Sequence, residues 1–598
     1  MRRTGYALST LLPFLLLSAA SHATSAAPAD TVYRNGYVYT VDAQDSVQQA
    51  LAVRDGRIVY VGDNAGAQDH TGAGTRVIDL QGRMLMPGLV DGHMHPQSGG
   101  TRLLNCSLDY LPLTVPQFQA RIQACLDQDA KKKVSPRRWL RVVNWFQQGM
   151  LPDGVEVTSA ALDSLQTSRP VVVRSSFGHS ALLNSRALKL AGVTRATPDP
   201  EGGKIARDAA GNATGLLEDA AQDMVGKFMP VLTPKENLAA SAAALDAMRK
   251  QGITTFLDAY TDPETLTAFS QLQKQGKLTA RAHFAVLVDP KDAQSGKAFR
   301  EIRQLAKQFD QGATRTAPSM QVRHAKLFMD GVIAAPALTG AMLAPYYSNQ
   351  GTPQQPHWAP GASKGPDSYF APALLKSTLS RLAKARIDPH IHTDGDGAVR
   401  DTLDALQALR ATPEGRDVRP ALAHDEIVDP ADFPRFKQLD ATAVLSFQWA
   451  KPAPDTVGAL KEYMGKERYA IVQPQSLLLD AGARIAYGSD WPVDPLDMWF
   501  ALKVGVTRTA SPAAGPEFAG RLGEAPGMPR AAVLRAVTMN AAYTLRQEKE
   551  TGSLEAGKLA DMIVLDRNFM EVPAEDIANI KVLQTVVGGK VVYDAGAL

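Results

Sequence analysis

The feature that most constrains the fold of this 598-residue chain is a long alternation of short apolar runs with helical stretches. It occupies residues 88–546. The runs between the helical stretches are Arg138 to Trp145, Pro170 to Arg174, Ile253 to Asp258, Arg281 to Val288, Val322 to Met329, Ile387 to His392, Ala421 to His424, Ala443 to Phe447 and Ile485 to Gly488. Such alternation predicts an α/β fold, most economically a (β/α)₈ TIM-like barrel with insertions. Because there are more than eight runs, at least one of them lies outside the barrel.

Both ends of the chain have a different pattern, with short alternating strands and Gly-containing turns. These strands are expected over residues 31–42, 51–62 and 77–86, and again over 561–566 and 582–594. We predict one small β-sandwich domain built from both termini, residues 28–87 and 547–598, with the barrel inserted between them. Within the barrel region, residues 202–215 predict a hairpin and residues 349–367 a long loop.

The first residues are typical of a secretory signal peptide. Arg2 and Arg3 precede an apolar run over residues 7–20, and Ser21-His22-Ala23 follows as a small-x-small cleavage site. The run is short for a membrane span, so cleavage (residues 1–23) is preferred to an uncleaved anchor. We expect a periplasmic or secreted protein with no membrane association after cleavage.

Cys106 and Cys125 are the only two cysteines. In an oxidising compartment they could form a disulfide, but their separation in space does not follow from the sequence. Pairing and free thiols therefore both stay open.

The charge balance argues against nucleic acid as a partner. The chain has 64 Lys plus Arg against 61 Asp plus Glu, a net charge of +3. Its densest basic cluster, residues 131–138, has no interleaved aromatic residues, so we interpret it as a solvated helix face. A small-molecule substrate is the expected partner, and the oligomeric state is left open.

The most informative stretch is Met86 to Pro96, in which a histidine pair follows an apolar run. His93 and His95 are two residues apart, so on a strand both face the same side and can reach one metal ion. Alone, such a pair would often be coincidental.

Four further candidates stand at or near the ends of later runs, where barrel enzymes assemble their sites. They are Lys326, His392, His424 and Asp490. The His and Asp residues bind zinc directly. Lys326 could become a metal ligand by reaction with carbon dioxide, which gives a carbamate; a lysine salt-bridged within the barrel is the alternative.

Together these residues resemble the carboxylated-lysine metal centre of the metal-dependent amidohydrolase superfamily. Further motifs are similar to the branch that includes the N-substituted formamide deformylases. These motifs are Asn184 to Val193, Thr197 to Gly203, Lys326 to Gly331, Gly488 to Val493 and Gly552 to Asp561. The resemblance covers nearly the whole mature chain.

The resemblance implies a role for each candidate. His93 and His95 would hold the more buried of two divalent metal ions, expected to be zinc, and His392 and His424 the more exposed one. Lys326 would bridge both as an N6-carboxylated lysine. Asp490 would be a metal ligand and the general base for an activated water that attacks an amide or another C–N bond.

Two positions depart from the branch pattern. The branch has His-Ala-Ile-Gly-Asp where this chain has His392-Thr-Asp-Gly-Asp396, which adds the carboxylate of Asp394 to the pocket. It also has Glu before the histidine where this chain has Ala423 before His424. His390 is expected to be a core histidine or to support a ligand, with direct metal binding as the weaker alternative.

The substrate is expected to be small, with an aromatic compound as one option. His179 is expected to contact the substrate or the developing oxyanion, with a purely structural role in its loop as the alternative. The aromatic residues predicted to bind substrate, each with ordinary packing as its alternative, are Trp145, Phe146, Tyr346, Trp449 and Trp491.

Two other functions stay open. The same metal site could hydrolyse an ester, lactone or phosphoester. A non-catalytic exported barrel that binds a metal or a ligand is the other alternative, and Asp490 argues against it because a binding protein needs no base beside its ligands.

Overall fold

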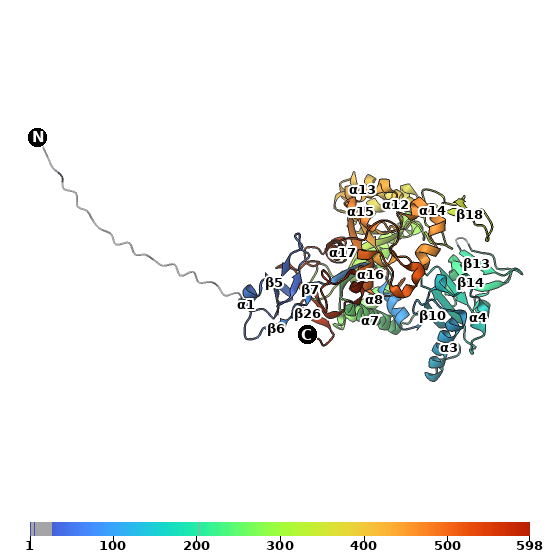
Figure 1. The fold of residues 1–598 in the computed structure, drawn as a ribbon, viewed down its shortest axis with the longest axis horizontal. Coiled ribbons are helices and arrows are strands. Elements are labelled where there is room, and N and C mark those ends of the chain that lie inside the picture. The colour runs from blue at the N-terminus through green and yellow to red at the C-terminus, as the bar shows by residue number, and fades with distance from the viewer. Residues whose placement is uncertain (2–4, 6–26, 153, 177, 201–202) are drawn as a thin grey trace.

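The computed structural model describes Met1, Gly5 and residues 27–152, 154–176, 178–200 and 203–598. Apart from Met1 and Gly5, the predicted signal peptide lies outside the described residues. The described chain has three parts in a row (Figure 1): strands from both termini at one end, a barrel in the middle, and a separate sheet at the other end.

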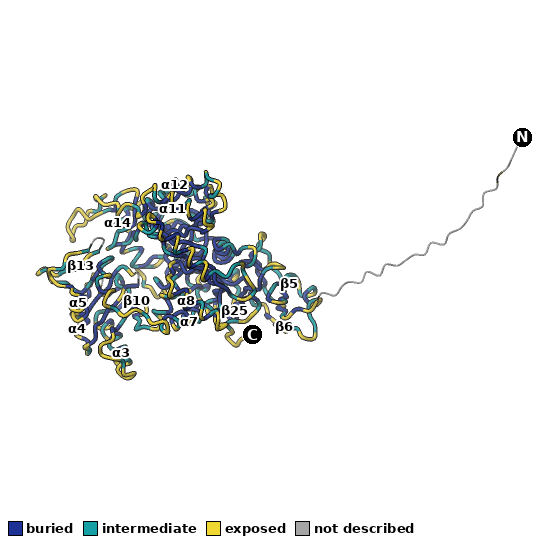
Figure 2. Tube along the Cα trace, turned by 180° about the vertical axis from the view of Figure 1, so that it is seen from behind, coloured by how far each residue is buried: buried dark blue, intermediate teal, exposed yellow. Residues whose placement is uncertain are grey.

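The middle part confirms the predicted barrel. Eight parallel strands form a nearly closed sheet in the order β23-β22-β21-β20-β17-β16-β15-β8. Their bounds are β8 Leu89–Met94, β15 Ile253–Thr261, β16 Arg281–Leu287, β17 Met320–Phe328, β20 Asp388–Thr393, β21 Ala421–His424, β22 Thr442–Leu445 and β23 Arg484–Tyr487. Most residues of these strands are buried, and the barrel forms the dark interior of Figure 2, so their sequences read as continuous apolar runs.

Helices pack around the barrel strands and bury their apolar faces against them. Helix α7, for example, begins with Pro234 after a capping box in which Thr233 and Glu236 satisfy each other's backbone N–H groups. The outer helices are α7 Pro234–Lys250, α8 Pro263–Lys274, α10 Lys297–Phe309, α11 Pro372–Lys384, α12 Asp396–Arg410, α13 Phe433–Gln438, α15 Gln475–Asp480 and α16 Met498–Thr507.

The barrel interior is closed at the amino-terminal ends of its strands. Small and aliphatic residues from the strands, including Ala285 and Ala421, pack there against Ala541, Ala542 and Leu545 of the segment around α18 (Ala541–Thr544). Because this end is filled, only the opposite end, where the strands finish, is open for a site.

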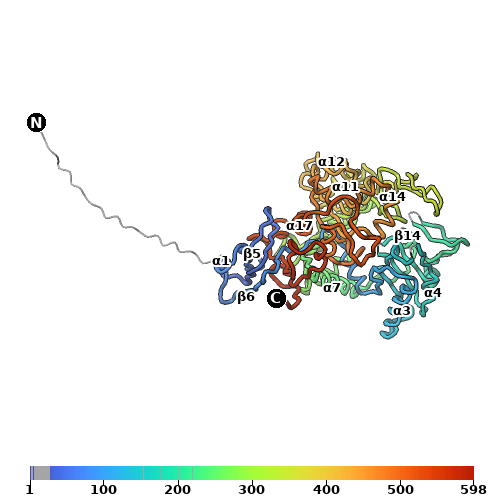
Figure 3. Tube along the Cα trace, in the orientation of Figure 1, coloured from blue at the N-terminus to red at the C-terminus, as the bar shows by residue number. Residues whose placement is uncertain are grey.

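The two termini form two sheets whose side chains, among them Leu51 and Val564, share one core. Figure 3 shows the blue and red tubes of the two termini side by side. One has the order β5-β4-β1-β6, and the other the order β26-β25-β24-β7-β2-β3. Their bounds are β1 Thr31–Arg34, β2 Tyr37–Tyr39, β3 Val47–Gln48, β4 Ala50–Arg54, β5 Arg57–Gly62, β6 Arg76–Asp79, β7 Met84–Pro87, β24 Met562–Leu565, β25 Val582–Val587 and β26 Lys590–Asp594. Strands β7 and β24 pair although they are far apart in the sequence.

Two of the runs assigned above to the barrel belong elsewhere. The runs over residues 138–145 and 170–174 become strands of a separate six-stranded sheet, here called the insert sheet, of order β13-β14-β12-β11-β10-β9. Its strands are β9 Cys106–Ser107, β10 Leu140–Trp145, β11 Val171–Ser175, β12 Ser180–Leu183, β13 Gly203–Arg207 and β14 Ala213–Asp219. The assignment was wrong because a short apolar run indicates only that a strand is buried. Which sheet the strand joins depends on its pairing with strands that are distant in the sequence. Strands β13 and β14 form the predicted hairpin.

Cys106 and Cys125 form a disulfide that joins strand β9 to helix α3 (Val115–Lys131). This settles the pairing that the sequence left open. Within the described part of the chain, no helix combines the length and the apolar composition that crossing a bilayer requires.

Candidate metal centre and its cavity

All six predicted metal-centre residues line one cavity of about 530 Å³ at the open end of the barrel. These residues are His93, His95, Lys326, His392, His424 and Asp490. They come from β8, β17, β20 and β21 and from the segments that follow β8 and β23. Since these strands are parallel, their carboxyl ends meet at one edge, which is the physical basis of the convergence.

The tightest group is His93, His95 and Asp490. Asp490 Oδ1 lies 3.3 Å from His93 Nε2 and 3.1 Å from His95 Nε2. One ligand atom from each residue lies within 4.8 Å of the other two. A backbone hydrogen bond between strand β8 and the segment after β23 holds this group together. In it, the Asp490 N–H donates to the His93 carbonyl oxygen at 2.8 Å. Asp490 also has a φ of 50°, a left-handed conformation that is uncommon outside glycine.

His93 has one nitrogen engaged and the other available. Its Nδ1 lies 2.8 Å from Nε2 of His390 in a hydrogen bond. Its Nε2 is buried and has no hydrogen-bond partner. Burial, with Lys326 nearby, lowers the pKa of His93 well below its usual value, so the imidazole is neutral, the form that binds metal.

His392 and His424 face each other on neighbouring strands, with ring centroids 4.6 Å apart. His392 Nδ1 donates to Asp330 Oδ1 at 3.2 Å, which leaves its Nε2 free. Asp330 is itself buried and also accepts hydrogen bonds from the backbone N–H groups of Ala341, Asp394 and Gly395. Burial lowers the pKa of both histidines.

Lys326 is fully enclosed within strand β17. Its Nζ lies 4.6 Å from the centroid of the Phe328 ring. Burial lowers the pKa of Lys326 to about 7, although the nearby Asp490 acts in the opposite direction. A buried amine with this pKa is neutral in a substantial fraction of molecules near pH 7, and the neutral form is nucleophilic.

The pKa of Asp490 shifts in the opposite direction to that of the buried Asp91 on the neighbouring strand β8. Burial raises the pKa of Asp490, but a hydrogen bond from His95 and the neighbouring His424 and Lys326 outweigh it, so the net pKa is lowered. Asp91, by contrast, has its pKa raised to about 7 by burial. Asp91 Oδ1 accepts hydrogen bonds from the backbone N–H groups of His93 and Ser489. It thereby links strand β8 to the segment that carries Asp490.

These residues are suited to a divalent metal. A partnerless buried imidazole nitrogen, neutral histidines and an ionised carboxylate form a donor set that binds zinc and similar ions. His93, His95 and Asp490 would hold one ion, and His392 and His424 face the same cavity.

One wall of the cavity comes from the insert sheet. His179 and Ser180 line it from the start of β12, Gln147 from the segment after β10, and Lys204 and Glu218 from the β13–β14 hairpin. His179 therefore lines the cavity, and its contact with the substrate stays a prediction. The opposite wall includes Trp449, whose ring stacks on His424 with centroids 5.5 Å apart.

The other four aromatic predictions are corrected, because these residues do not line the cavity. Trp145 is 1% exposed and packs against Phe118 in the core of the insert. Tyr346 is buried, and its hydroxyl donates to the Gly340 carbonyl oxygen at 2.9 Å. The two remaining rings face glycines: Phe146 lies against Gly149, and Trp491 against Gly99 of helix α2 (Pro96–Leu103).

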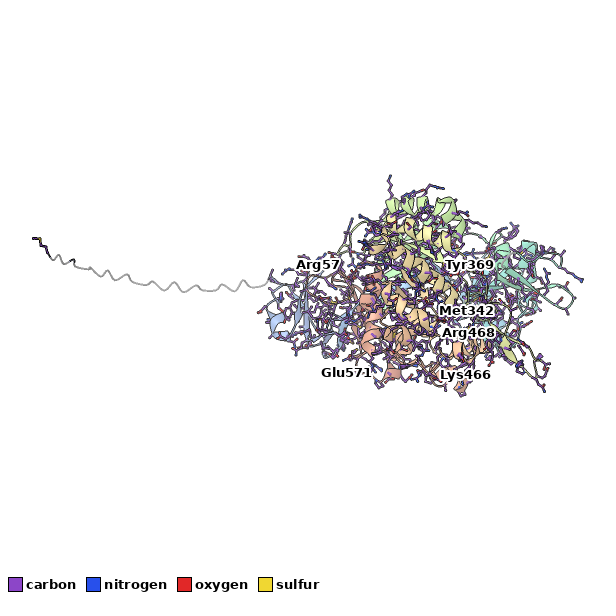
Figure 4. All side chains as sticks on the ribbon, turned by 90° about the horizontal axis from the view of Figure 1, so that it is seen from above. Arg57, Met342, Tyr369, Lys466, Arg468 and Glu571 are labelled. Atoms are coloured by element: carbon purple, nitrogen blue, oxygen red, sulfur yellow. A yellow bond between two sulfur atoms is a disulfide. The ribbon has the colours of Figure 1, made fainter. Side chains whose placement is uncertain are left out.

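The segment between β17 and α11 forms part of the cavity rim. Helix α14 (Lys461–Tyr469) holds it, because Arg468 donates to the carbonyl oxygens of Ala344 at 3.0 Å and Pro345 at 2.6 Å. In Figure 4, Arg468 lies close to Met342 of this segment and far from Arg57 of the terminal sheets.

A second group of acids lines the same cavity. Asp394 follows β20, Glu426 follows β21, and Asp455 lies in the segment after β22. Burial, together with Glu426 and Asp330, raises the pKa of Asp394 well above its usual value. Burial likewise raises the pKa of Glu426 to about 8.

Asp330 and Asp91 support the candidate ligands, although neither residue was predicted to belong to the site. Asp330 lies within the Lys326 to Gly331 motif, two residues after strand β17, and Asp91 lies two residues before His93. An acid at such a position was the available signal. The hydrogen bonds that give these acids their roles depend on contacts made only in the folded barrel.

Comparison with known proteins agrees with this geometry. The model of the Amidohydrolase family matches residues 76–593. The chain is 27% identical to the protein LONG AFTER FAR-RED 3 of Arabidopsis thaliana, over 94% of this chain and 92% of that protein. It is 24% identical to N-substituted formamide deformylase of Arthrobacter pascens, over 94% of this chain and 98% of that enzyme. In fold it resembles an uncharacterized metal-dependent hydrolase of Pyrococcus horikoshii, with a TM-score of 0.68, 20% identity and coverage of 91% of this chain and 99% of that one.

Proposed function

The chain belongs to the amidohydrolase family, and from this premise we propose that it is an exported metal-dependent hydrolase that cleaves an amide or another C–N bond of a small substrate. The observation that carries the proposal is the convergence of four histidines, a buried lysine and an ionised aspartate on one cavity. The relationship to a formamide deformylase over nearly the full length supports a C–N bond as the target.

Two divalent ions bound by these residues would polarise the scissile carbonyl and increase the acidity of water. Asp490 is the residue proposed to move protons. Both of its histidine contacts go to Oδ1, which leaves its other oxygen to accept a proton from the attacking water and return it to the leaving nitrogen. Its lowered pKa keeps it ionised and ready to act as a base near pH 7.

Lys326 is proposed to be carboxylated. Its neutral amine would form a bond to the carbon of carbon dioxide and release one proton, which yields an anionic carbamate oxygen donor. Burial supports this step, because it lowers the pKa of the amine, and the apolar contact with Phe328 shields the product from water.

The metal content of the purified protein tests the centre. We expect about two zinc ions per chain in the wild type and loss of at least one in Lys326→Ala. Lys503→Ala is a matched control, since Lys503 is also buried but binds Thr509 and Ala510 away from the cavity. A wild type without metal would refute the metal centre, and unchanged metal content in Lys326→Ala would refute the bridging role.

Paired substrates test the reaction. The amide and the ester of one aromatic acid should be offered to the wild type and to Asp490→Asn. We expect the amide to be hydrolysed, and we expect the substitution to lower kcat by about 100-fold or more because it removes the proton acceptor. Hydrolysis of the ester alone would favour the esterase alternative, and a wild type inactive on a broad amide panel would favour a binding protein.

Export is proposed from the amino-terminal leader and is supported by the Cys106–Cys125 disulfide, since disulfides persist in oxidising compartments. Mass spectrometry of the amino terminus after cell fractionation tests this proposal. Cleavage near Ala23 in the periplasm or medium is the expected result.

A further inference from the structure

The imidazole of His424 is held differently from those of the other buried candidate ligands. A hydrogen bond with His390 at 2.8 Å fixes the ring of His93, and one with Asp330 at 3.2 Å fixes the ring of His392. In the described part of the chain, the contacts of the His424 ring are with other rings and are not hydrogen bonds. The plane of this imidazole is therefore set by packing.

The backbone at His424 makes this packing important. Strand β21 ends at His424, whose φ of 85° is a left-handed conformation that is uncommon outside glycine, and Asp425 follows with a φ of 45°. Such conformations persist only where the surrounding structure holds them. Because the strand does not continue past the ligand, the direction of the side chain depends on what lies against its ring.

The indole of Trp449 lies flat on the His424 ring. The two centroids are 5.5 Å apart and the planes differ by 22°, whereas the rings of His93 and His392 meet the same imidazole at 65° and 59°. Trp449 is 8% exposed and lines the cavity. A flat, buried indole of this kind restricts rotation of the imidazole out of its plane.

Asp494 anchors the indole. Its Oδ2 accepts a hydrogen bond from Trp449 Nε1 at 2.8 Å. The turn that carries Trp449 is tied to the same segment by a second hydrogen bond, which Gln448 Nε2 donates to the Ser489 carbonyl oxygen at 2.7 Å. The stacked ring is thus fixed to the segment after β23, which also supplies Asp490.

We propose that Trp449, anchored by Asp494, is a positioning residue for His424 and for the metal ion that His392 and His424 would hold. A metal ion on an imidazole draws electron density from the ring, and the electron-rich face of an indole attracts such a ring more strongly than the free one. The stack would therefore stabilise the metal-bound state as well as fix the plane. This inference rests on the proposed function, because it assigns a support to one part of the same metal centre.

Calorimetric titration of the metal-free protein with zinc tests the inference. The binding step that is lost in His392→Ala identifies the ion on this side of the cavity. In Trp449→Leu we expect that step to weaken by about 10-fold or more, as is usual when a ligand loses its support, and the other step to change by about 2-fold or less.

Variants of the anchor separate its hydrogen bond from its charge. Asp494→Ala removes the acceptor of the indole N–H and should weaken the same step by about 3-fold or more, whereas Asp494→Asn keeps an acceptor oxygen and should stay within about 2-fold of the wild type. Trp449→Phe keeps an aromatic ring but has no N–H to donate. In the double variant Trp449→Phe/Asp494→Ala, the second substitution should therefore have no further effect.

Trp145→Leu is the matched control, because it removes an equally large buried indole from the core of the insert, away from the residues that line the cavity. Both zinc-binding steps should keep their wild-type affinities in this variant. A thermal melt accompanies every variant. If Trp449→Leu does not fold, Trp449→Phe and Asp494→Ala decide.

Three results would overturn the inference and leave the metal centre in place: an unchanged His392-dependent step in Trp449→Leu, equal losses in both steps, or an Asp494→Asn variant as weak as Asp494→Ala. A wild type that binds no zinc would refute the metal centre and this inference with it. A selective loss of zinc in a protein that hydrolyses no amide would keep the positioning role and reject the hydrolase.

Discussion

His390 Nε2 lies 2.8 Å from His93 Nδ1, so that one barrel histidine orients another. The two residues lie on β20 and β8, which are not neighbours in the sheet, and their contact crosses the barrel interior. This hydrogen bond directs the partnerless Nε2 of His93 toward Asp490.

Replacement of His390 by Phe should therefore weaken metal binding without removing a ligand. The ring volume is kept, but His93 Nδ1 loses its partner, and loss of such a support typically costs about 10- to 100-fold in metal affinity. Titration of the metal-free protein with zinc measures the change. His324→Phe is the control, because His324 is also a buried barrel histidine but contacts the Thr544 carbonyl oxygen; equal losses in both variants would refute a specific role for His390.

Asp330 should affect both metal affinity and stability. Asp330→Ala removes the acceptor for His392 Nδ1 and for three backbone N–H groups, and each buried unsatisfied donor costs about 1–3 kcal/mol. We expect the free energy of unfolding to fall by about 3 kcal/mol or more, with weaker zinc binding as well. Urea denaturation and zinc titration measure the two effects. Asp396→Ala, which removes an acceptor for the Leu343 N–H without touching His392, should lower stability only.

The barrel is joined to the terminal sheets by a buried ion pair. Arg281 Nε donates to Asp561 Oδ2 at 2.6 Å, and its Nη2 donates to Oδ1 at 2.9 Å. Arg281→Met leaves an uncompensated buried carboxylate, so we expect a loss of about 3–5 kcal/mol in unfolding free energy. The double variant Arg281→Met/Asp561→Leu should recover most of this loss; if it is as unstable as the single variant, the charge is not the cause.

The disulfide should stabilise the insert and leave the metal centre unaffected. Cys106 and Cys125 are 19 residues apart, and a loop of this size predicts a contribution of about 3 kcal/mol. The double variant Cys106→Ala/Cys125→Ala should become sensitive to proteolysis within the insert sheet at lower urea concentration. Its zinc content should equal that of the wild type, and a loss of zinc would show that insert and barrel are more tightly coupled than we infer.

The barrel and the candidate ligands could be predicted because their signals are local. Parallel strands buried on both faces read as apolar runs, and the spacing of His93 and His95 places both on one side of a strand. The position of Lys326, His392, His424 and Asp490 near strand ends then implied one shared edge. For these residues, chain order and strand polarity are enough to predict that they lie near one another.

The environment of the aromatic residues could not be predicted from local sequence patterns. Trp449 lines the cavity, whereas Trp145 is in a core and Trp491 packs on a glycine, yet all three follow or flank apolar runs in the same way. The face that each ring presents depends on what packs against it from elsewhere in the chain. The assignment of residues 138–145 and 170–174 to the barrel was wrong for the same reason.

The sequence by itself determined the kind of fold, the family and the chemical types gathered at the open end of the barrel, because strand periodicity and motif spacing are properties of short segments. Only the tertiary structure decided that His390 supports His93, that Asp330 holds His392 and that Cys106 pairs with Cys125. The residues joined by these contacts are separated by between 19 and 297 positions in the sequence. They arise when closure of the barrel and packing of the insert bring such residues within hydrogen-bonding distance.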